Sequence, residues 1–323
     1  MCRHLAYLGP PTSLRAVLID PLHGLYRQAW APRLMRHGTV NADGFGVGWY
    51  ADGDPTPARY RRAVPIWADE SLPDLARVTR STAVLAAVRN ATEGMAGGER
   101  AAAPFASGPW LFSHNGALAG WPATAATATA MAGAGAATLL SLEAMVDSAF
   151  LWALALERLR AGRSMAAALS ETIGAVEAAD ASGRFNFLLT DGQSIAATAC
   201  GDTLWYRRSG GGSVVVASEP GDDEPGWTEV PDRQLLTATP SLVSVRPLAP
   251  EIDVVRADSP PAPNPRNAPS PPEASSPPGA PEAPGTPGTP GTPSTPSTPS
   301  TPSTPSTPSV LATTSATKGS VTG

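Results

Sequence analysis

The sequence predicts an α+β fold with antiparallel sheets, followed by an unstructured carboxyl-terminal tail. Short runs of β-branched and aromatic residues occupy both ends of the first 255 residues, and helical periodicity fills the middle. From residue 256 onward Pro, Ser, Thr, Gly and Ala dominate. Strands that follow one another without intervening helices favour antiparallel sheets over a parallel βαβ plan. We therefore expect one folded domain at 2–255 and a tail at 256–323.

The predicted strands are apolar or alternating segments that end at turn-forming residues. They lie at residues 4–9, 45–51, 58–64, 83–89, 110–116, 185–191, 194–199, 202–208, 213–218 and 242–248.

The middle of the chain predicts two consecutive helices. Residues 138–162 carry an apolar stripe at helical spacing, with Gly162 as the expected C-cap. A second helix is expected over 164–181, starting at Ser164 as N-cap. Residues 124–138 are too rich in Ala, Gly and Thr to assign. The stripe of the first helix comprises Leu139, Leu142, Met145, Val146, Ala149 and Phe150.

Composition excludes several classes of function. The net charge is −5 and Arg residues are scattered, so we expect no nucleic-acid partner. No apolar run approaches the ~20 residues of a membrane span, and no secretory signal is recognised, so we expect a cytoplasmic protein without membrane contact. The four histidines are far apart and neither cysteine belongs to a CxxC pair, which predicts no metal and no cofactor.

Cys2 is the first candidate for chemistry. Once Met1 is removed, this residue carries both a thiol and a free α-amine, whose ordinary pKa values are about 8.5 and about 7.7 to 8.0. The amine is then a competent base for the thiol beside it near neutral pH. Taken alone, Cys2 also fits an incidental small residue.

Three further motifs each have a functional and a structural interpretation. Asn115 and Gly116 fit a type I′ hairpin turn, or two hydrogen-bond donors to an oxyanion. Arg89 ends a strand, where it is either a surface charge or a clamp for a carboxylate. Asp147 lies within the first predicted helix, facing solvent or an inward cation. Together with Cys2, these residues suffice to hold a γ-glutamyl group and attack its amide.

Six segments resemble the class II glutamine amidotransferases and occur in that family's order: "MCRHLAYLG", "NADGFGVGWY", "VRNATEG", "SHNG", "VDSAF" and "VVVASEP". The resemblance implies the four-layer αββα sandwich of N-terminal nucleophile hydrolases. It also implies that Cys2 is the nucleophile, with Asn115 and Gly116 at the oxyanion.

The resemblance further implies that Arg89, Thr92 and Asp147 bind the glutamyl group. We include His114 in this predicted substrate-binding set, although its position also fits a packing role.

The expected reaction releases an amine instead of ammonia, because only the tail follows the predicted domain and no synthase domain is seen to consume ammonia. Ala87 and Asn90 stand where the family often has His and an aromatic residue, which leaves room for a larger amide substituent. The stretches "APRLMRHGTVNADGFGVGWY" and "AAPFASGPWLFSHNG" resemble the branch of the family that hydrolyses γ-glutamyl-hercynylcysteine S-oxide in ergothioneine biosynthesis. That branch implies a small-molecule γ-glutamyl substrate and a γ-glutamyl thioester on Cys2.

Two alternatives stay open from the sequence. One is a free-standing glutaminase or amidotransferase subunit that releases ammonia from glutamine. The other is a non-catalytic binding module whose tail is an interaction segment. The tail has almost nothing apolar to bury and repeats at period three over 285–309, so it is predicted to remain extended and is a candidate contact for other proteins.

Overall fold

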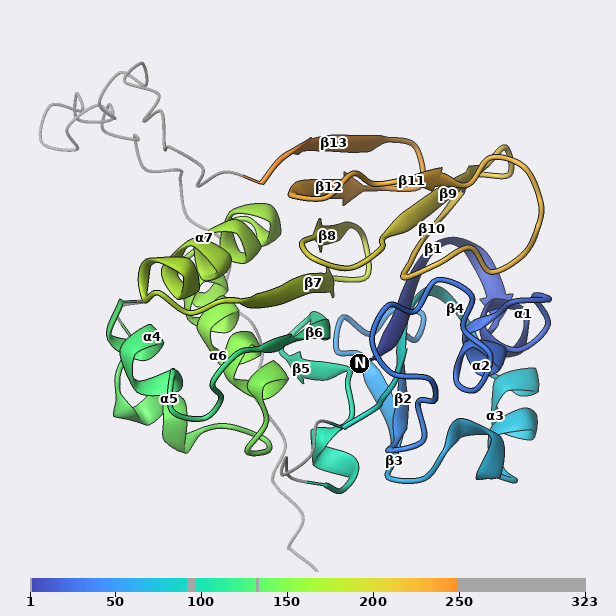
Figure 1. Ribbon diagram of the computed structural model, residues 1–323. Helices are drawn as coiled ribbons and strands as arrows, with labels where there is room; N and C mark the ends of the chain where they lie inside the picture. Colours follow the sequence, from blue (N-terminus) through green and yellow to red (C-terminus); the bar gives the residue numbers. More distant parts are fainter. Residues whose placement is uncertain (1, 92–96, 132–133, 249–323) are drawn as a thin grey trace, which may run out of the picture. The chain divides into compact units, whose positions relative to one another are not determined.

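The computed structural model describes residues 2–91, 97–131 and 134–248 (Figure 1). The predicted tail and the predicted boundary at 255 and 256 lie outside the described residues.

Two antiparallel sheets form the centre of the described fold. Sheet A has the strand order β11-β9-β10-β1-β4-β2-β3, and sheet B has the order β13-β12-β8-β7-β6-β5. The strands of sheet A are β1 (Arg3–Ser13), β2 (Phe45–Trp49), β3 (Ala58–Arg62), β4 (Arg80–Val88), β9 (Trp205–Ser209), β10 (Ser213–Ala217) and β11 (Thr228–Glu229). Those of sheet B are β5 (Phe105–Ser107), β6 (Trp110–Leu118), β7 (Gly183–Thr190), β8 (Ile195–Ala199), β12 (Gln234–Ala238) and β13 (Val243–Pro247).

Helices cover the outer face of each sheet, and Figure 1 shows the two groups on opposite sides of the paired sheets. Over sheet A lie α1 (Leu14–Leu18), α2 (Leu25–Gln28) and α3 (Leu72–Val78). Over sheet B lie α4 (Ala125–Met131), α5 (Ala136–Leu140), α6 (Asp147–Arg160) and α7 (Met165–Ala178), and short 3₁₀ turns occur at Ile66–Ala68 and Glu99–Ala101. The predicted αββα sandwich is confirmed.

Strand alternation builds the three apolar layers of this sandwich. On β1, Leu5 and Tyr7 pack against the helices over sheet A, whereas Ala6 and Leu8 pack between the sheets. Fully burying a leucine contributes about 1.5 to 3 kcal/mol. Between the sheets the backbones also approach closely. A Cβ on Gly46 would therefore collide with the Ala103 carbonyl oxygen. Small residues on β2 therefore let the segment before β5 lie against sheet A.

The prediction of one helix over 138–162 is wrong. The chain leaves α5 after Leu140 and starts α6 only at Asp147. Met145, which was assigned to the apolar stripe, is 59% exposed. Asp147 provides the physical reason, because its carboxylate accepts the backbone N–H of Leu118 on β6 and of Ser148. An acidic residue at a helix N-terminus is also favoured by the helix dipole.

Other boundaries agree with the prediction. Gly162 follows α6 in the left-handed conformation, with φ of 84°. Ser164 caps α7, and its Oγ accepts the Ala167 N–H at 3.1 Å. Residues 124–138, which the sequence left unassigned, contain α4 and most of the described part of α5.

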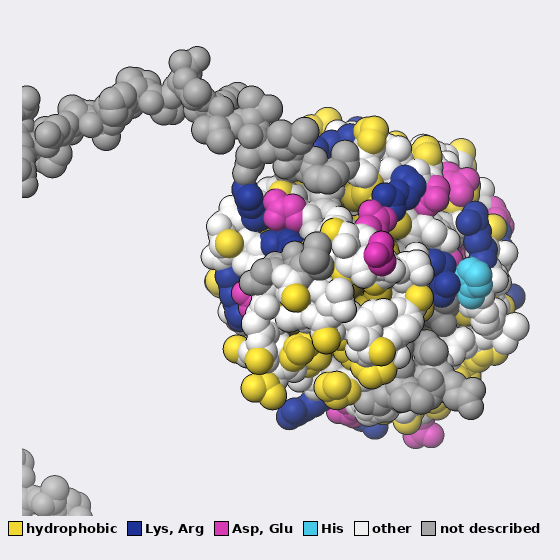
Figure 2. Space-filling model, turned by 60° about the vertical axis from the view of Figure 1, so that its left-hand side comes forward, with side chains coloured by type: hydrophobic (Ala, Val, Ile, Leu, Met, Phe, Trp, Pro, Cys, Tyr) yellow, Lys and Arg dark blue, Asp and Glu magenta, His cyan; other side chains and the backbone are white. Residues whose placement is uncertain are grey.

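The surface carries mixed charges. On the face shown in Figure 2, acidic and basic side chains are interspersed, and apolar side chains gather toward one edge. Among the described residues, no helix combines the length and apolar composition that a bilayer crossing requires.

Candidate active site

A small pocket opens at the amino end of β1, between the two sheets. Its lining includes five residues of the predicted site: Cys2, Arg89, His114, Gly116 and Asp147. They lie just before β1, just after β4, in β6 and in α6, so residues separated by up to 145 positions in the chain meet here. Thr92 lies outside the described residues.

Strand register places Cys2 beside Arg89. In the antiparallel pair of β1 and β4, Arg3 lies opposite Val88. Continuing that register by one residue brings Cys2 opposite Arg89, and alternation turns both toward the space between the sheets. Cys2 is half-buried and carries a free thiol. The nucleophile candidate and the carboxylate clamp candidate are therefore neighbours on one sheet.

The second sheet brings Asn115 to the same place. His4 Nδ1 on β1 lies 3.1 Å from Ser113 Oγ on β6, across the space between the sheets. Two residues further toward the pocket on each strand stand Cys2 and Asn115. Asn115 is completely buried between two residues that line the pocket. Neither its Nδ2 nor its Oδ1 has a hydrogen-bond partner among the described residues.

A buried amide without partners is rare in native proteins, because leaving it unpaired costs about 1–3 kcal/mol. Such a group is expected to meet water or an incoming ligand. Asn115 Nδ2 is therefore suited to donate a hydrogen bond to the oxygen of a bound carbonyl group.

The structure excludes the type I′ hairpin turn, which was one of the two interpretations of Asn115 and Gly116. Both residues lie inside β6, where they pair with Asn186 and Phe185 of β7. Glycine is required for close packing, because a Cβ on Gly116 would collide with the Arg184 carbonyl oxygen. The oxyanion interpretation of this dipeptide is thus compatible with the geometry, and the turn interpretation is not.

Asp147 faces inward and not toward solvent. It is 4% exposed and is the first residue of α6. Its Oδ2 accepts the Leu118 N–H at 2.9 Å, and its Oδ1 accepts the Ser148 N–H at 2.7 Å. Ser148 Oγ also lies 3.3 Å from Oδ1, so the spare acceptor capacity toward the pocket is on Oδ2, since an ionised carboxylate offers about four lone-pair sites. The pocket wall therefore carries a fixed negative charge.

His114 connects β6 to its neighbours. Its Nε2 lies 2.8 Å from the Arg184 carbonyl oxygen, which can only accept, so Nε2 carries the proton. Its Nδ1, 3.0 Å from Ser148 Oγ, then accepts from that hydroxyl. Burial lowers the pKa of His114 and favours the neutral ring. Both ring nitrogens are engaged by the protein, which favours a packing role and limits direct contact with substrate.

Asp43 holds the strand end that carries Arg89. Its Oδ2 accepts the Ala91 N–H at 2.7 Å, and its backbone N–H donates to the Arg89 carbonyl at 2.9 Å. Arg89 itself is 7% exposed and donates from Nη1 to the Asp43 carbonyl at 3.4 Å. The carboxylate of Asp43 therefore fixes the backbone beyond Arg89.

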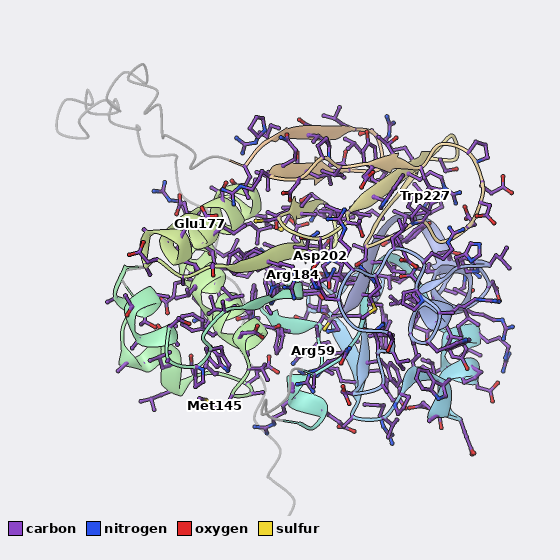
Figure 3. All side chains as sticks on the ribbon, viewed as in Figure 1. Arg59, Met145, Glu177, Arg184, Asp202 and Trp227 are labelled. Carbon is purple, nitrogen blue, oxygen red and sulfur yellow. The ribbon has the colours of Figure 1, made fainter. Side chains whose placement is uncertain are left out.

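Sequence reasoning missed a charged cluster behind the nucleophile. Arg3 is completely buried, and none of its guanidinium nitrogens has a hydrogen-bond partner among the described residues. Burial lowers the pKa of Arg3, against the opposing attraction of Glu219 and Asp202. Asp202 in turn accepts from Arg184 Nε at 3.2 Å, and Figure 3 shows these two side chains together beside β7. The sequence carries little sign of this cluster, because Asp202 opens a segment whose residues predict only a strand.

We predict that His4 makes folding stability depend on pH. Complete burial is the main cause that lowers the pKa of His4 to about 3, so below its ordinary value of about 6.5 only the unfolded chain takes up this proton. The contribution of His4 to the free energy of unfolding is fully present above about pH 6.5 and declines as the pH falls toward 3. Between about pH 7.5 and pH 5 it should reduce the free energy of unfolding by about 2 kcal/mol.

Urea unfolding of the wild type and of a His4→Gln variant at both pH values measures this term. The variant should lose most of that pH dependence, whereas His37→Gln, at an exposed position, should keep it. Equal pH dependence in the His4→Gln variant and the wild type would contradict the prediction.

Comparisons with known proteins identify one family. Residues 28–211 match the family model described as glutamine amidotransferases class II. The chain is 42% identical over 250 residues to the gamma-glutamyl-hercynylcysteine sulfoxide hydrolase of Mycolicibacterium smegmatis, covering 77% of this chain and 100% of that protein.

Solved structures agree with the fold. The class II domain protein from Silicibacter pomeroyi has a TM-score of 0.54 at 27% identity, covering 77% of this chain and 100% of that one. The glutamine PRPP amidotransferase of B. subtilis also has a TM-score of 0.54, at 16% identity over 77% of this chain and 49% of that one, and indicates the fold alone. With its family model, its relatives and its αββα sandwich in agreement, the chain belongs to the class II glutamine amidotransferases.

Proposed function

We propose that this chain hydrolyses γ-glutamyl-hercynylcysteine S-oxide to hercynylcysteine S-oxide and glutamate. The observation that carries the chemistry is the meeting of Cys2, Arg89 and Asp147 in one pocket, next to Asn115, whose side-chain amide has no hydrogen-bond partner among the described residues. The substrate is supported by the 42% identical relative, whose name states that activity. The proposed location is the cytoplasm, and the proposed catalytic domain is 2–255.

The proposed reaction has two halves. After removal of Met1, the α-amine of Cys2 takes the thiol proton while the sulfur attacks the γ-carbonyl carbon. The oxyanion that forms receives hydrogen bonds from Asn115 Nδ2 and the Gly116 N–H. The C–N bond then breaks, the departing amine takes the proton, and a γ-glutamyl thioester remains. Water, activated by the same α-amine, splits the thioester to glutamate and the free thiol.

Arg89 and Asp147 are proposed to hold the two charged ends of the glutamyl group. The guanidinium of Arg89 pairs with the α-carboxylate, and the carboxylate of Asp147 pairs with the α-ammonium. Both side chains are buried, so these pairs form in a site largely removed from water. No cofactor takes part in this proposal. Within the described residues, no group of three or more metal-binding side chains lies together.

We predict that Arg89→Ala raises KM for the γ-glutamyl substrate by roughly 10- to 100-fold, because a charge-assisted hydrogen bond contributes about 1.5–3 kcal/mol. Asp147→Asn should act in the same direction. Steady-state kinetics beside a thermal melt separates binding from folding. Arg77→Ala is the matched control, since Arg77 is an exposed arginine that, within the described part of the chain, pairs with Asp74 alone. An unchanged KM in a folded Arg89→Ala variant would remove Arg89 from the site.

The small side chain of Ala87 and the polar side chain of Asn90 support the amine-releasing reaction. Ala87 and Asn90 both line the pocket. They are smaller or more polar than the His and the aromatic residue that the family often has at these positions. The test is kcat/KM for γ-glutamyl-hercynylcysteine S-oxide against kcat/KM for glutamine. A preference for the S-oxide supports the proposal. A clear preference for glutamine would instead favour a glutaminase or an amidotransferase subunit.

A further inference from the structure

One carboxylate binds two arginines at the edge of sheet A. Glu143 lies 2.9 Å from Arg61 Nη1 and 3.2 Å from Arg59 Nη1. Both arginines belong to β3, the edge strand, and alternation places them on the same face. Figure 3 labels Arg59 in the region where β3 faces the segment before α6. All three side chains are less than a third exposed.

The two arginines also hold the segment that forms one wall of the active-site pocket. Arg61 Nη1 donates to the Ala102 carbonyl at 3.4 Å, and Arg59 Nη1 donates to the Pro104 carbonyl at 3.2 Å. Ala101 and Ala103, which alternate with these carbonyl-bearing residues, line the pocket.

Glu143 belongs to the other wall. It lies in the segment between α5 and α6, four residues before Asp147. Val146, Asp147 and Ser148 at the end of this segment line the pocket. The Arg59–Glu143–Arg61 cluster therefore links the two walls and fixes the approach to the residue that we assign to the substrate ammonium.

Removing the charge of Glu143 would replace attraction in this cluster by repulsion. With Glu143 neutral, two neighbouring guanidiniums would repel each other without a shared partner. Partial burial already lowers the pKa of Arg61, and the nearby charge of Arg59 adds to that effect. Breaking a partly buried ion cluster by removing one charge is strongly unfavourable, so the segment that carries Glu143 should shift.

We propose that Glu143 is a positioning residue, which sets the place of Asp147 in the pocket and thereby the affinity for the glutamyl ammonium. This inference rests on the proposed function of the same site. It assigns a role in substrate binding to a side chain that lies outside the lining of the pocket.

The test compares Glu143→Gln with Glu171→Gln. Glu171 on α7 is a matched control, because it also binds two arginines, Arg158 of α6 and Arg163 of the loop between α6 and α7, none of which lines the pocket. We expect Glu143→Gln to raise KM for the γ-glutamyl substrate roughly tenfold or more, with kcat much less affected, since misplacement of a binding group by about 1 Å costs up to 100-fold. Glu171→Gln should leave KM unchanged.

Glu143→Asp keeps the charge on a shorter side chain and should give an intermediate KM. This variant also decides the matter if Glu143→Gln does not fold. A wild-type KM in folded Glu143→Gln or Glu143→Asp, or an equal rise in Glu171→Gln, would overturn the inference. Failure of the wild type to hydrolyse any γ-glutamyl amide would instead overturn the proposed function, so the two failures are distinguishable.

Discussion

Replacing Cys2 by alanine should reduce turnover of the γ-glutamyl substrate by roughly 10⁴-fold or more while leaving the fold intact. In the proposed reaction no other residue forms the thioester, and loss of a catalytic nucleophile removes most of the rate enhancement. Cys2 precedes β1 and is only half-buried, so alanine at this position leaves no cavity in the core. Steady-state assay of the purified variant beside its circular dichroism spectrum measures both effects.

Cys200 is the matched control for this variant. It is a buried member of the apolar layer over sheet B, where burial raises the pKa of its thiol and Arg233 donates to its sulfur at 3.4 Å. Cys200→Ala should therefore keep kcat and KM and lower only stability. Substantial activity in the Cys2→Ala variant would contradict nucleophilic catalysis by this residue.

Replacing Asn115 by alanine should lower kcat by about 100- to 1,000-fold, with a smaller change in KM. Removing one oxyanion donor has this magnitude in other enzymes, because the hydrogen bond is strongest in the transition state. The side chain has no protein partner to lose among the described residues, so the variant should lose little stability beyond that of a small cavity.

Asn186 lies opposite Asn115 on β7, and its side-chain amide, unlike that of Asn115, is hydrogen-bonded to the protein. Its amide accepts from Cys200 and Asp202 N–H groups and donates to the Asp202 carbonyl, so it holds the loop between β8 and β9. Asn186→Ala should lower the free energy of unfolding more than Asn115→Ala does, and lower kcat less. The opposite ranking of the two variants would remove Asn115 from the oxyanion site.

The sequence predicted the strands better than the helices, for reasons of length and packing. Short runs of β-branched and aromatic residues, such as those in β10 and β6, carry their own signal, because these residues favour strands. The helices α1, α2 and α3 have four to seven residues, too few for a periodicity to be read. The break before Asp147 depends on the backbone N–H of Leu118, a partner 29 residues away, so local periodicity continued through it.

The candidate site was predictable as a set of residues but not as a network. The six segments that occur in the order of the family identified Cys2, Arg89 and Asp147, and the structure places these residues in one pocket. The strand position of Asn115 could not be read from a dipeptide that also forms turns. Glu143 carried no signal at all, because its arginine partners lie more than 80 residues earlier in the chain. Ion pairs between distant elements become visible only once the fold is known.

Intact-protein mass spectrometry of enzyme quenched in acid during turnover tests the central claim most directly. The account predicts a mature chain that has lost Met1, together with a fraction that carries one γ-glutamyl group on the peptide beginning at Cys2. Fully active enzyme that retains Met1, or a γ-glutamyl group attached to any other residue, would contradict it.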